Sequence, residues 1–179
     1  HANAAHRVET KASRASAPQP EAWTNLGIYA GPVQDVAVDP LTGRTYLVLN
    51  DRPGIYRSSD GGMHWESTGT DLMAAHRIIV ITETLAPTGT TLSHVYATSE
   101  AGLVHSDDDG ETWTTLTDGA PYAGRIPGFD VDPGDPDHIV IGAGSSANFD
   151  GGIYVTWDGG VDWTTAHSAM MASPSYLST

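Results

Sequence analysis

Two arginines are the side chains in this sequence best suited to hold an anion. The dipeptides His76-Arg77 and Gly124-Arg125 each stand directly before a short apolar run. A guanidinium group presents several N–H donors in a plane and pairs well with a carboxylate or sulfate. If the two runs are equivalent strands, both guanidinium groups point into the same end of a central channel. We therefore expect Arg77 and Arg125 to bind a ligand; the alternative, and the commoner role, is that they offset nearby Asp and Glu.

Acidic and imidazole side chains raise the question of metal binding. The runs Asp107-Asp108-Asp109-Gly110 and Asp130–Asp137 place carboxylates at short spacing, but neither has the loop pattern with a distant bidentate Glu. The sequence therefore predicts no metal site and no cofactor, with calcium as the alternative. Five scattered histidines lack ligand spacing on one element and are expected to be surface or hairpin residues: His64, His76, His94, His105 and His138.

Composition excludes several classes of partner. The 179 residues carry 22 acidic and 8 basic side chains, a formal charge of −14, whereas nucleic acids and anionic membranes attract basic surfaces. There is no cysteine, which excludes disulfides and thiol chemistry, and no run of about twenty apolar residues to span a membrane. The chain starts at His1 rather than Met, which fits a processed exported protein, a proteolytic fragment or a start introduced by cloning; we expect an extracellular or periplasmic location.

The elements that must position these side chains are set by an internal repeat. Three segments align: GIYRSSDGGMHW from Gly54, GLVHSDDDGETW from Gly102 and GIYVTWDGGVDW from Gly152. Their first hydroxyl residues, Ser58, Ser106 and Thr156, are separated by 48 and 50 residues. Short β-type runs punctuated by Gly, Pro and Asp surround the repeats, and no helical period is evident. A period near fifty is typical of one propeller blade.

Each repeat predicts a rigid hairpin turn. The Asp carboxylate can accept backbone N–H bonds, the following Gly supplies a positive φ, and the Ser or Thr hydroxyl closes a second local bond. The Trp then lays a large apolar face on neighbouring strands. We assign this structural role to Ser58, Asp60, Gly62, Trp65, Ser106, Asp108, Gly110, Thr112, Trp113, Thr156, Asp158, Gly160 and Trp163.

The segment Ser106–Trp113 matches Ser-x-Asp-x-Gly-x-Thr-Trp at every defined position, and so resembles the Asp-box, or bacterial neuraminidase repeat. The flanking copies depart from it, because His64 and Asp162 replace the Thr and Thr156 replaces the Ser. In the resembling families, which include sialidases, glycoside hydrolases that cleave xyloglucan, sortilin-type receptors and photosystem assembly factors, the box lies on the outer rim of β-propeller blades. The resemblance therefore implies a scaffold rather than an activity.

On this template the chain is all-β, a partial β-propeller of about three four-stranded antiparallel blades. A flexible arm (1–21) precedes the blade region (22–179), with an outer closing strand at 22–26, blade one at 32–68, blade two at 75–117, blade three at 124–166, and a further strand or tail at 167–179. In blade two, Ile78–Ile81 and His94–Thr98 are the expected first strands. Three blades leave two apolar faces open. We expect missing sequence, a second copy or a partner subunit to complete the ring.

The sialidase resemblance raises the question of whether the chain holds catalytic residues. That chemistry needs three convergent arginines, a Tyr–Glu pair and an acid Asp. Arg125-Ile126-Pro127 resembles the sialidase Arg-Ile-Pro signature but follows two of the boxes instead of preceding them, and Asp35 and Asp130 are weak candidates for paired carboxylates. We therefore expect no catalytic residues in a non-catalytic exported module that binds a protein or glycan. The alternatives are a fragment of a sialidase-like or glucanase-like glycoside hydrolase and an accessory subunit of a larger assembly.

Overall fold

The fold of this chain consists of β-strands joined by turns. The computed structural model describes residues 31–50, 52–69, 72, 75–118, 120–121, 125–144 and 151–168, and these contain twelve strands and no helix. The expected all-β class is therefore confirmed. The predicted arm at 1–21 and outer strand at 22–26 lie outside the described residues, as do residues 169–179 of the tail, and all three stay predictions. No helix in the described part is long and apolar enough to cross a membrane.

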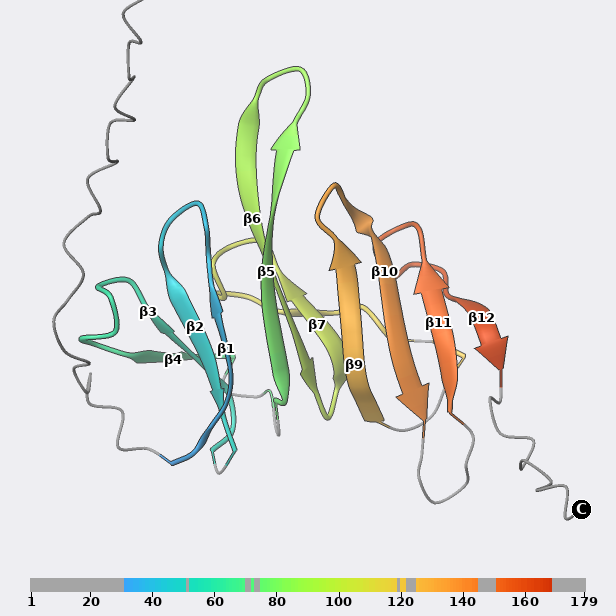
Figure 1. Ribbon diagram of the computed structural model, residues 1–179, viewed down its shortest axis with the longest axis horizontal. Helices are drawn as coiled ribbons and strands as arrows, with labels where there is room; N and C mark the ends of the chain where they lie inside the picture. Colours follow the sequence, from blue (N-terminus) through green and yellow to red (C-terminus); the bar gives the residue numbers. More distant parts are fainter. Residues whose placement is uncertain are drawn as a thin grey trace, which may run out of the picture.

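The strands form three separate four-stranded antiparallel sheets, each built from consecutive strands. Figure 1 shows the sheets side by side in chain order. Sheet one contains β1 (Val33–Val38), β2 (Thr45–Leu49), β3 (Ile55–Ser58) and β4 (Glu66–Thr68). Sheet two contains β5 (Arg77–Leu85), β6 (Thr90–Ser99), β7 (Gly102–Ser106) and β8 (Thr114–Thr115). Sheet three contains β9 (Arg125–Asp132), β10 (Asp135–Gly144), β11 (Gly152–Thr156) and β12 (Thr164–Ser168).

Two apolar clusters hold the sheets together, one in each gap between neighbouring sheets. Strict alternation along β10 shows the origin of such a cluster, because Ile139, Ile141 and Ala143 are buried and the residues between them are not. These side chains pack with Phe129 of β9 and Tyr96 of sheet two. The cluster between sheets one and two contains Tyr46, Val48, Ile55, Leu72, Ala75, Ile78, Val95, Ala97 and Val104. Sheet two is therefore covered on both faces.

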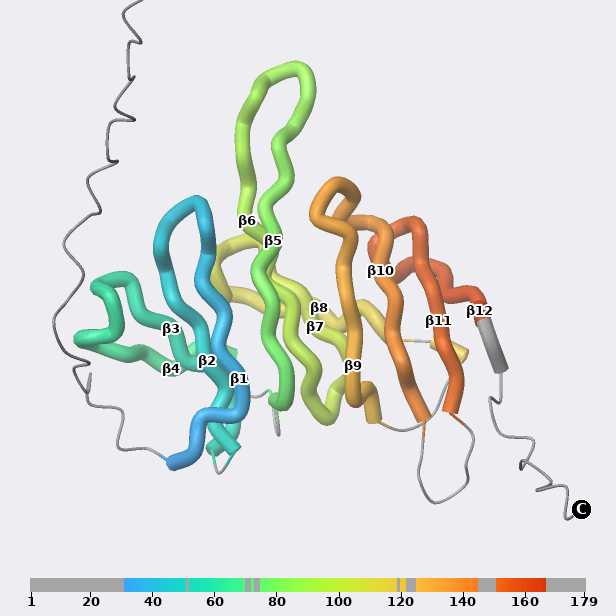
Figure 2. The backbone as a smooth tube through the Cα atoms, viewed as in Figure 1, coloured from blue at the N-terminus to red at the C-terminus, as the bar shows by residue number. Residues whose placement is uncertain are grey.

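The first hairpin of sheet two is longer than the sequence analysis expected. The predicted strands Ile78–Ile81 and His94–Thr98 extend to Arg77–Leu85 and Thr90–Ser99. The added ladder is rich in β-branched residues, and Thr84 Oγ1 lies 3.2 Å from Thr91 Oγ1 across the two strands. The backbone trace in Figure 2 shows this hairpin reaching beyond the corresponding β1–β2 and β9–β10 hairpins.

Candidate functional site

Three aspartate turns connect β3 to β4, β7 to β8 and β11 to β12, and we call them turns one, two and three. In turn two the Ser106 hydroxyl donates to Asp108 Oδ1 at 2.8 Å and accepts the Gly110 N–H at 2.8 Å. Asp108 Oδ1 also accepts the Thr112 N–H at 2.8 Å, and Oδ2 accepts the Thr112 hydroxyl at 2.6 Å. Each hydrogen bond closes a ring within the turn, so the turn is held by its own side chains.

Turns one and three keep these bonds despite their different residues. The Thr156 hydroxyl replaces serine and contacts Asp158 Oδ1 at 2.7 Å. In turn one His64 takes the place of Thr112, with His64 Nδ1 at 2.5 Å from Asp60 Oδ2. Asp162 provides only its backbone N–H, 2.9 Å from Asp158 Oδ1. The hydroxyl–aspartate–glycine part is therefore common to all three turns, while the second carboxylate oxygen has different partners.

These donors stabilise the ionised carboxylates. Bonds from the Thr112 hydroxyl and N–H lower the pKa of Asp108 to about 2. The pKa of Asp60 falls well below its usual value, chiefly through the His64 N–H and then the His64 ring. The Asp162 N–H and then the Thr156 hydroxyl lower the pKa of Asp158. All three aspartates are therefore charged at neutral pH, as turn acceptors.

Turns two and three each dock on the preceding sheet at an equivalent place, three residues after that sheet's tryptophan. The Thr68 hydroxyl donates to the Gly110 carbonyl, and Trp163 Nε1 donates to the Leu116 carbonyl at 3.0 Å. A Cβ on Gly160, where φ is +96°, would lie 2.8 Å from the Leu116 carbonyl oxygen, so only glycine fits this approach. The turns thus help to join the sheets.

The first strands of the three sheets line a groove of about 830 Å³. Its walls come from residues 34–36 of β1, residues 77–79 of β5 with His76 before them, residues 125–127 of β9, and Gly144. Arg77 and Arg125 are the first residues of β5 and β9, and both line this groove. The structure therefore brings the two candidate residues to one place. That they bind a ligand stays a prediction.

Neighbouring aromatic rings position both arginines. Arg125 Nη2 lies 2.5 Å from His76 Nε2, and burial, followed by the Arg125 charge, lowers the pKa of His76. Neutral His76 therefore accepts a hydrogen bond from Nη2 of Arg125. The Arg77 guanidinium carbon lies 5.6 Å from the centroid of the Phe129 ring, within range of a cation–π contact.

Asp35 is the one acidic side chain among the described residues that line the groove, and its oxygens are already engaged. Oδ1 accepts the Val36 N–H at 2.9 Å, and Oδ2 accepts the Ile78 N–H of the next sheet at 3.0 Å. Asp130 does not line the groove, and its Oδ1 accepts the Val131 N–H at 3.1 Å. The structure therefore does not pair Asp35 with Asp130 as an acid–base couple there.

The carboxylates that suggested calcium point to different partners. Asp107 contacts His94 and His105, Asp108 accepts hydrogen bonds within its own turn, and Asp109 forms an ion pair with Arg44, the residue before β2. In the second run, Asp132 accepts the Gly134 N–H at 2.8 Å and Asp135 accepts the Asp137 N–H at 3.3 Å, as in ordinary turns. Calcium binding stays an untested alternative from the sequence.

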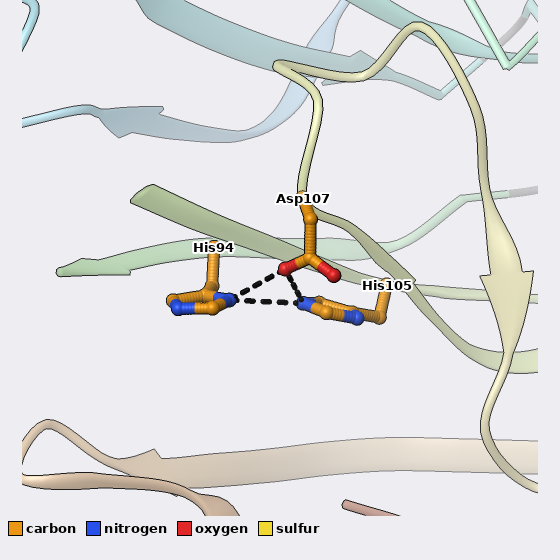
Figure 3. A group of neighbouring side chains, drawn as sticks. All are labelled: His94, His105 and Asp107. Atoms are coloured by element: carbon orange, nitrogen blue, oxygen red, sulfur yellow. Dashed lines mark hydrogen bonds and ion pairs between the residues drawn. The ribbon is translucent and has the colours of Figure 1, made fainter. Parts of the chain in front are cut away.

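A histidine cluster was not expected from the sequence. His94, predicted to be a surface or hairpin residue, is only 8% exposed, and its Nδ1 lies 3.3 Å from His105 Nε2 and 2.6 Å from Asp107 Oδ1 (Figure 3). Burial lowers the pKa of His105, whose ring stacks on Tyr96 with centroids 4.5 Å apart. The register of β6 and β7 explains the cluster. Tyr96 pairs with His105, so His94 and Asp107, each two residues away, face each other on the same side of the sheet.

Comparisons with known proteins place the fold among β-propellers. Neither a protein-family model nor a curated protein matches the sequence. Solved structures similar to the chain include an ancestral GH74 enzyme (TM-score 0.55, 22% identity), covering 78% of this chain and 19% of the enzyme. For YCF48 from Cyanidioschyzon merolae the TM-score is 0.53 at 17% identity, and the match covers 74% of this chain and 39% of the YCF48 chain. For a nidogen/laminin complex structure the TM-score is 0.54 at 17% identity, and the match covers 78% of this chain and 49% of the matched chain. The three sheets are therefore blades of a partial β-propeller, and the chain spans less than half of each of these three chains.

Proposed function

We propose that the chain is part of an exported, non-catalytic β-propeller that binds an anionic group of a protein or glycan in its inner groove. The observation that carries this proposal is the convergence of Arg77 and Arg125 on one groove in a chain with a formal charge of −14. The only acid lining the described groove, Asp35, accepts two backbone N–H groups. Two guanidinium groups therefore remain to attract a carboxylate or sulfate.

The three turns support a scaffold role for the rest of the chain. Their hydroxyl–aspartate–glycine bonds are made within each turn, and the tryptophans that follow turns two and three pack against the apolar clusters between the sheets. We propose that they are Asp-boxes, as the resemblance of Ser106–Trp113 implies. Because they lie at the opposite edge of each sheet from the groove-lining strands, their role here is to fix the blades.

Binding of simple anions tests the groove directly. Sulfate and acetate should shift the NMR signals of the Arg77 and Arg125 side-chain N–H groups, and glycan arrays bearing sulfated, carboxylated and neutral sugars then identify the preferred anion. The variant Arg77→Gln/Arg125→Gln should weaken binding at least tenfold, because it removes both charges. Arg52→Gln, in an exposed loop before β3, serves as the control. Equal binding by the double variant and the wild type would contradict the proposal.

A glycoside hydrolase fragment is the second candidate, favoured by the likeness in fold to an ancestral GH74 enzyme. Release of reducing ends from a soluble β-glucan, lost in Asp35→Asn, would support it against the binding module. Co-purification of the chain with one fixed protein, in constant ratio, would instead favour the accessory-subunit alternative. The engaged state of Asp35 supports the non-catalytic role.

A further inference from the structure

The histidine cluster gathers three metal-ligating atoms at one point outside the groove. His94 Nδ1 and His105 Nε2 lie 2.6 Å and 2.9 Å from the same oxygen, Asp107 Oδ1. Figure 3 shows both rings presenting a nitrogen towards this carboxylate. All three ligand atoms lie within 4.8 Å of one another. Two imidazoles and one carboxylate form a donor set that suits late first-row divalent metals.

The second nitrogen of His94 indicates which form of the cluster is favourable. His94 Nε2 is buried and makes no hydrogen bond among the described residues, and Glu83 Oε2 lies 3.5 Å from it. With the proton on Nδ1, an unprotonated Nε2 would face this carboxylate, which is unfavourable. With the proton on Nε2, the ring faces Glu83 with an N–H, and the Nδ1 lone pair faces Asp107 Oδ1 at 2.6 Å, where a cation bound by both atoms would remove their repulsion. That is the carboxylate–histidine–metal arrangement, in which Glu83 holds the ring in the ligating tautomer.

The repeat supplies an independent reason to regard the cluster as unusual. Arg57 and His105 occupy the same place, one residue before the hydroxyl residue of their turns. Arg57 forms ion pairs with Glu66 of its own sheet and with Glu111 of the docked turn two. In turn three, the residue equivalent to Glu111 is Val161. His105 therefore has no carboxylate to meet at that position of the docked turn, and Asp107 of its own sheet approaches both imidazoles instead.

The geometry can accept a metal ion with a small movement of one exposed side chain. Ligand atoms of a tetrahedral zinc site lie about 3.3 Å apart when metal–ligand bonds are about 2.0 Å long. The two imidazole nitrogens already have this separation, at 3.3 Å. Asp107, with 65% of its side chain exposed, can withdraw by a fraction of an ångström. A hollow of about 220 Å³, also lined by Glu83, Tyr96 and Asp137, leaves room for water as a fourth ligand.

We propose that His94, His105 and Asp107 bind one Zn²⁺ ion between sheets two and three, with Glu83 as the residue that positions His94. The ion lies where one nitrogen of each imidazole and Asp107 Oδ1 converge. Because the ligands come from β6 and from β7 with the turn that follows it, the ion links strands of one blade at the face covered by the next blade.

Calorimetric titration of the full chain with Zn²⁺ tests this site, and Co²⁺ gives a visible d–d spectrum of the same coordination. We expect one ion per chain, with binding lost in His105→Gln and weakened at least tenfold in Asp107→Asn. Glu83→Gln should weaken binding by about 10-fold to 100-fold and leave the stoichiometry at one. Asp107 is exposed, so its variant keeps the test valid even if a histidine variant fails to fold.

Two matched controls distinguish Zn²⁺ binding at this site from Zn²⁺ binding by other histidines of the chain. His138→Gln changes a histidine whose Nδ1 lies 3.6 Å from Asp132, and should bind Zn²⁺ like the wild type. His1→Gln/His6→Gln removes the histidines of the amino-terminal segment, and should also retain one bound ion. The proposal is overturned if the wild type binds no Zn²⁺, if Asp107→Asn and His105→Gln bind it unchanged, or if the amino-terminal variant loses it.

Discussion

The junction between sheets one and two and the junction between sheets two and three share their apolar parts and differ in their polar parts. Trp113 packs against the first apolar cluster and Trp163 against the second. At the first junction Arg44 and Arg57 form ion pairs with acidic residues of turn two. At the second, the equivalent places hold His94 and His105, beside a turn with Gly159 and Val161. The apolar contact between blades is therefore common to the two junctions, whereas the polar contact consists of arginine–carboxylate pairs at the first and of histidines at the second.

Removing a junction tryptophan should have the largest effect. Trp113→Ala and Trp163→Ala should each lower the free energy of unfolding by about 3 kcal/mol, because each leaves a cavity beside an apolar cluster. Trp65 belongs to neither cluster, so Trp65→Ala should cost about 1 kcal/mol. Denaturant unfolding of the three variants measures these differences. An equal loss for Trp65→Ala would show that the tryptophans act inside their own hairpins.

Removing Arg57, which lies at the first junction only, should cause the next largest loss in the free energy of unfolding. Arg57 is 13% exposed, contacts two carboxylates, and donates to the Asp109 carbonyl at 2.7 Å. Arg57→Met keeps the apolar stem and should cost about 1 to 2 kcal/mol in denaturant unfolding. Arg52→Met is the matched control and should be close to neutral. A loss below 0.5 kcal/mol, within the usual range of surface substitutions, would mean that the apolar contact alone holds this junction.

Acid should weaken turn one more than turn three. Asp60 and Asp158 have pKa values lowered by folding, so they stabilise the protein above the unfolded-state value of about 3.9, and this stability is lost as pH falls further. The pKa of Asp60 is lowered further than that of Asp158, so Asp60→Asn should lower the thermal midpoint at pH 7 and reduce its fall below pH 4. Asp158→Asn should have the same effect to a smaller extent. The reverse order would show that docking of turn three on sheet two, and not the pKa shift, sets the acid sensitivity.

Introducing a copy of the Arg57–Glu111 ion pair at the second junction should cause the smallest change in the free energy of unfolding. In His105→Arg/Val161→Glu, the new residues copy Arg57 and Glu111. Val161 is 79% exposed, so the new pair is largely solvated and should contribute about 0.5 kcal/mol. A double-mutant cycle with both single variants measures the coupling, and denaturation in high salt should reduce it. Absence of coupling would show that the two junctions differ in backbone geometry as well as in side chains.

The repeat allowed the fold to be predicted because its key residues act locally. Ser106, Asp108 and Gly110 bond to one another within five residues, so spacing along the chain is sufficient to identify the turn. The spacing of successive turns then gave the four-stranded sheets. The extension of β5 and β6 was missed because alternating threonines beyond Ile81 resemble an exposed loop until their partner strand is known.

The candidate site was less predictable because it depends on contacts between strands and sheets. Arg77 and Arg125 could be paired through their equivalent positions before apolar runs. His94 and Asp107, thirteen residues apart, meet only in the register that pairs Tyr96 with His105. Arg57 of β3 bonds to the Asp109 carbonyl because turn two docks beside it, a contact that spacing along the chain does not reveal.

Docking of turns two and three on the preceding sheet gives the series of blades a polarity. Gly110 meets Thr68 and Gly160 meets Leu116, so every contact joins unlike surfaces, in the manner of a heterologous interface. Turn one lies at one end of the series, and Ala166, three residues after Trp163, occupies at the other end the position of Thr68 and Leu116. A further blade that repeats this contact, whether from the same polypeptide or another, must therefore join head to tail. Pairing two like ends would reproduce none of these contacts.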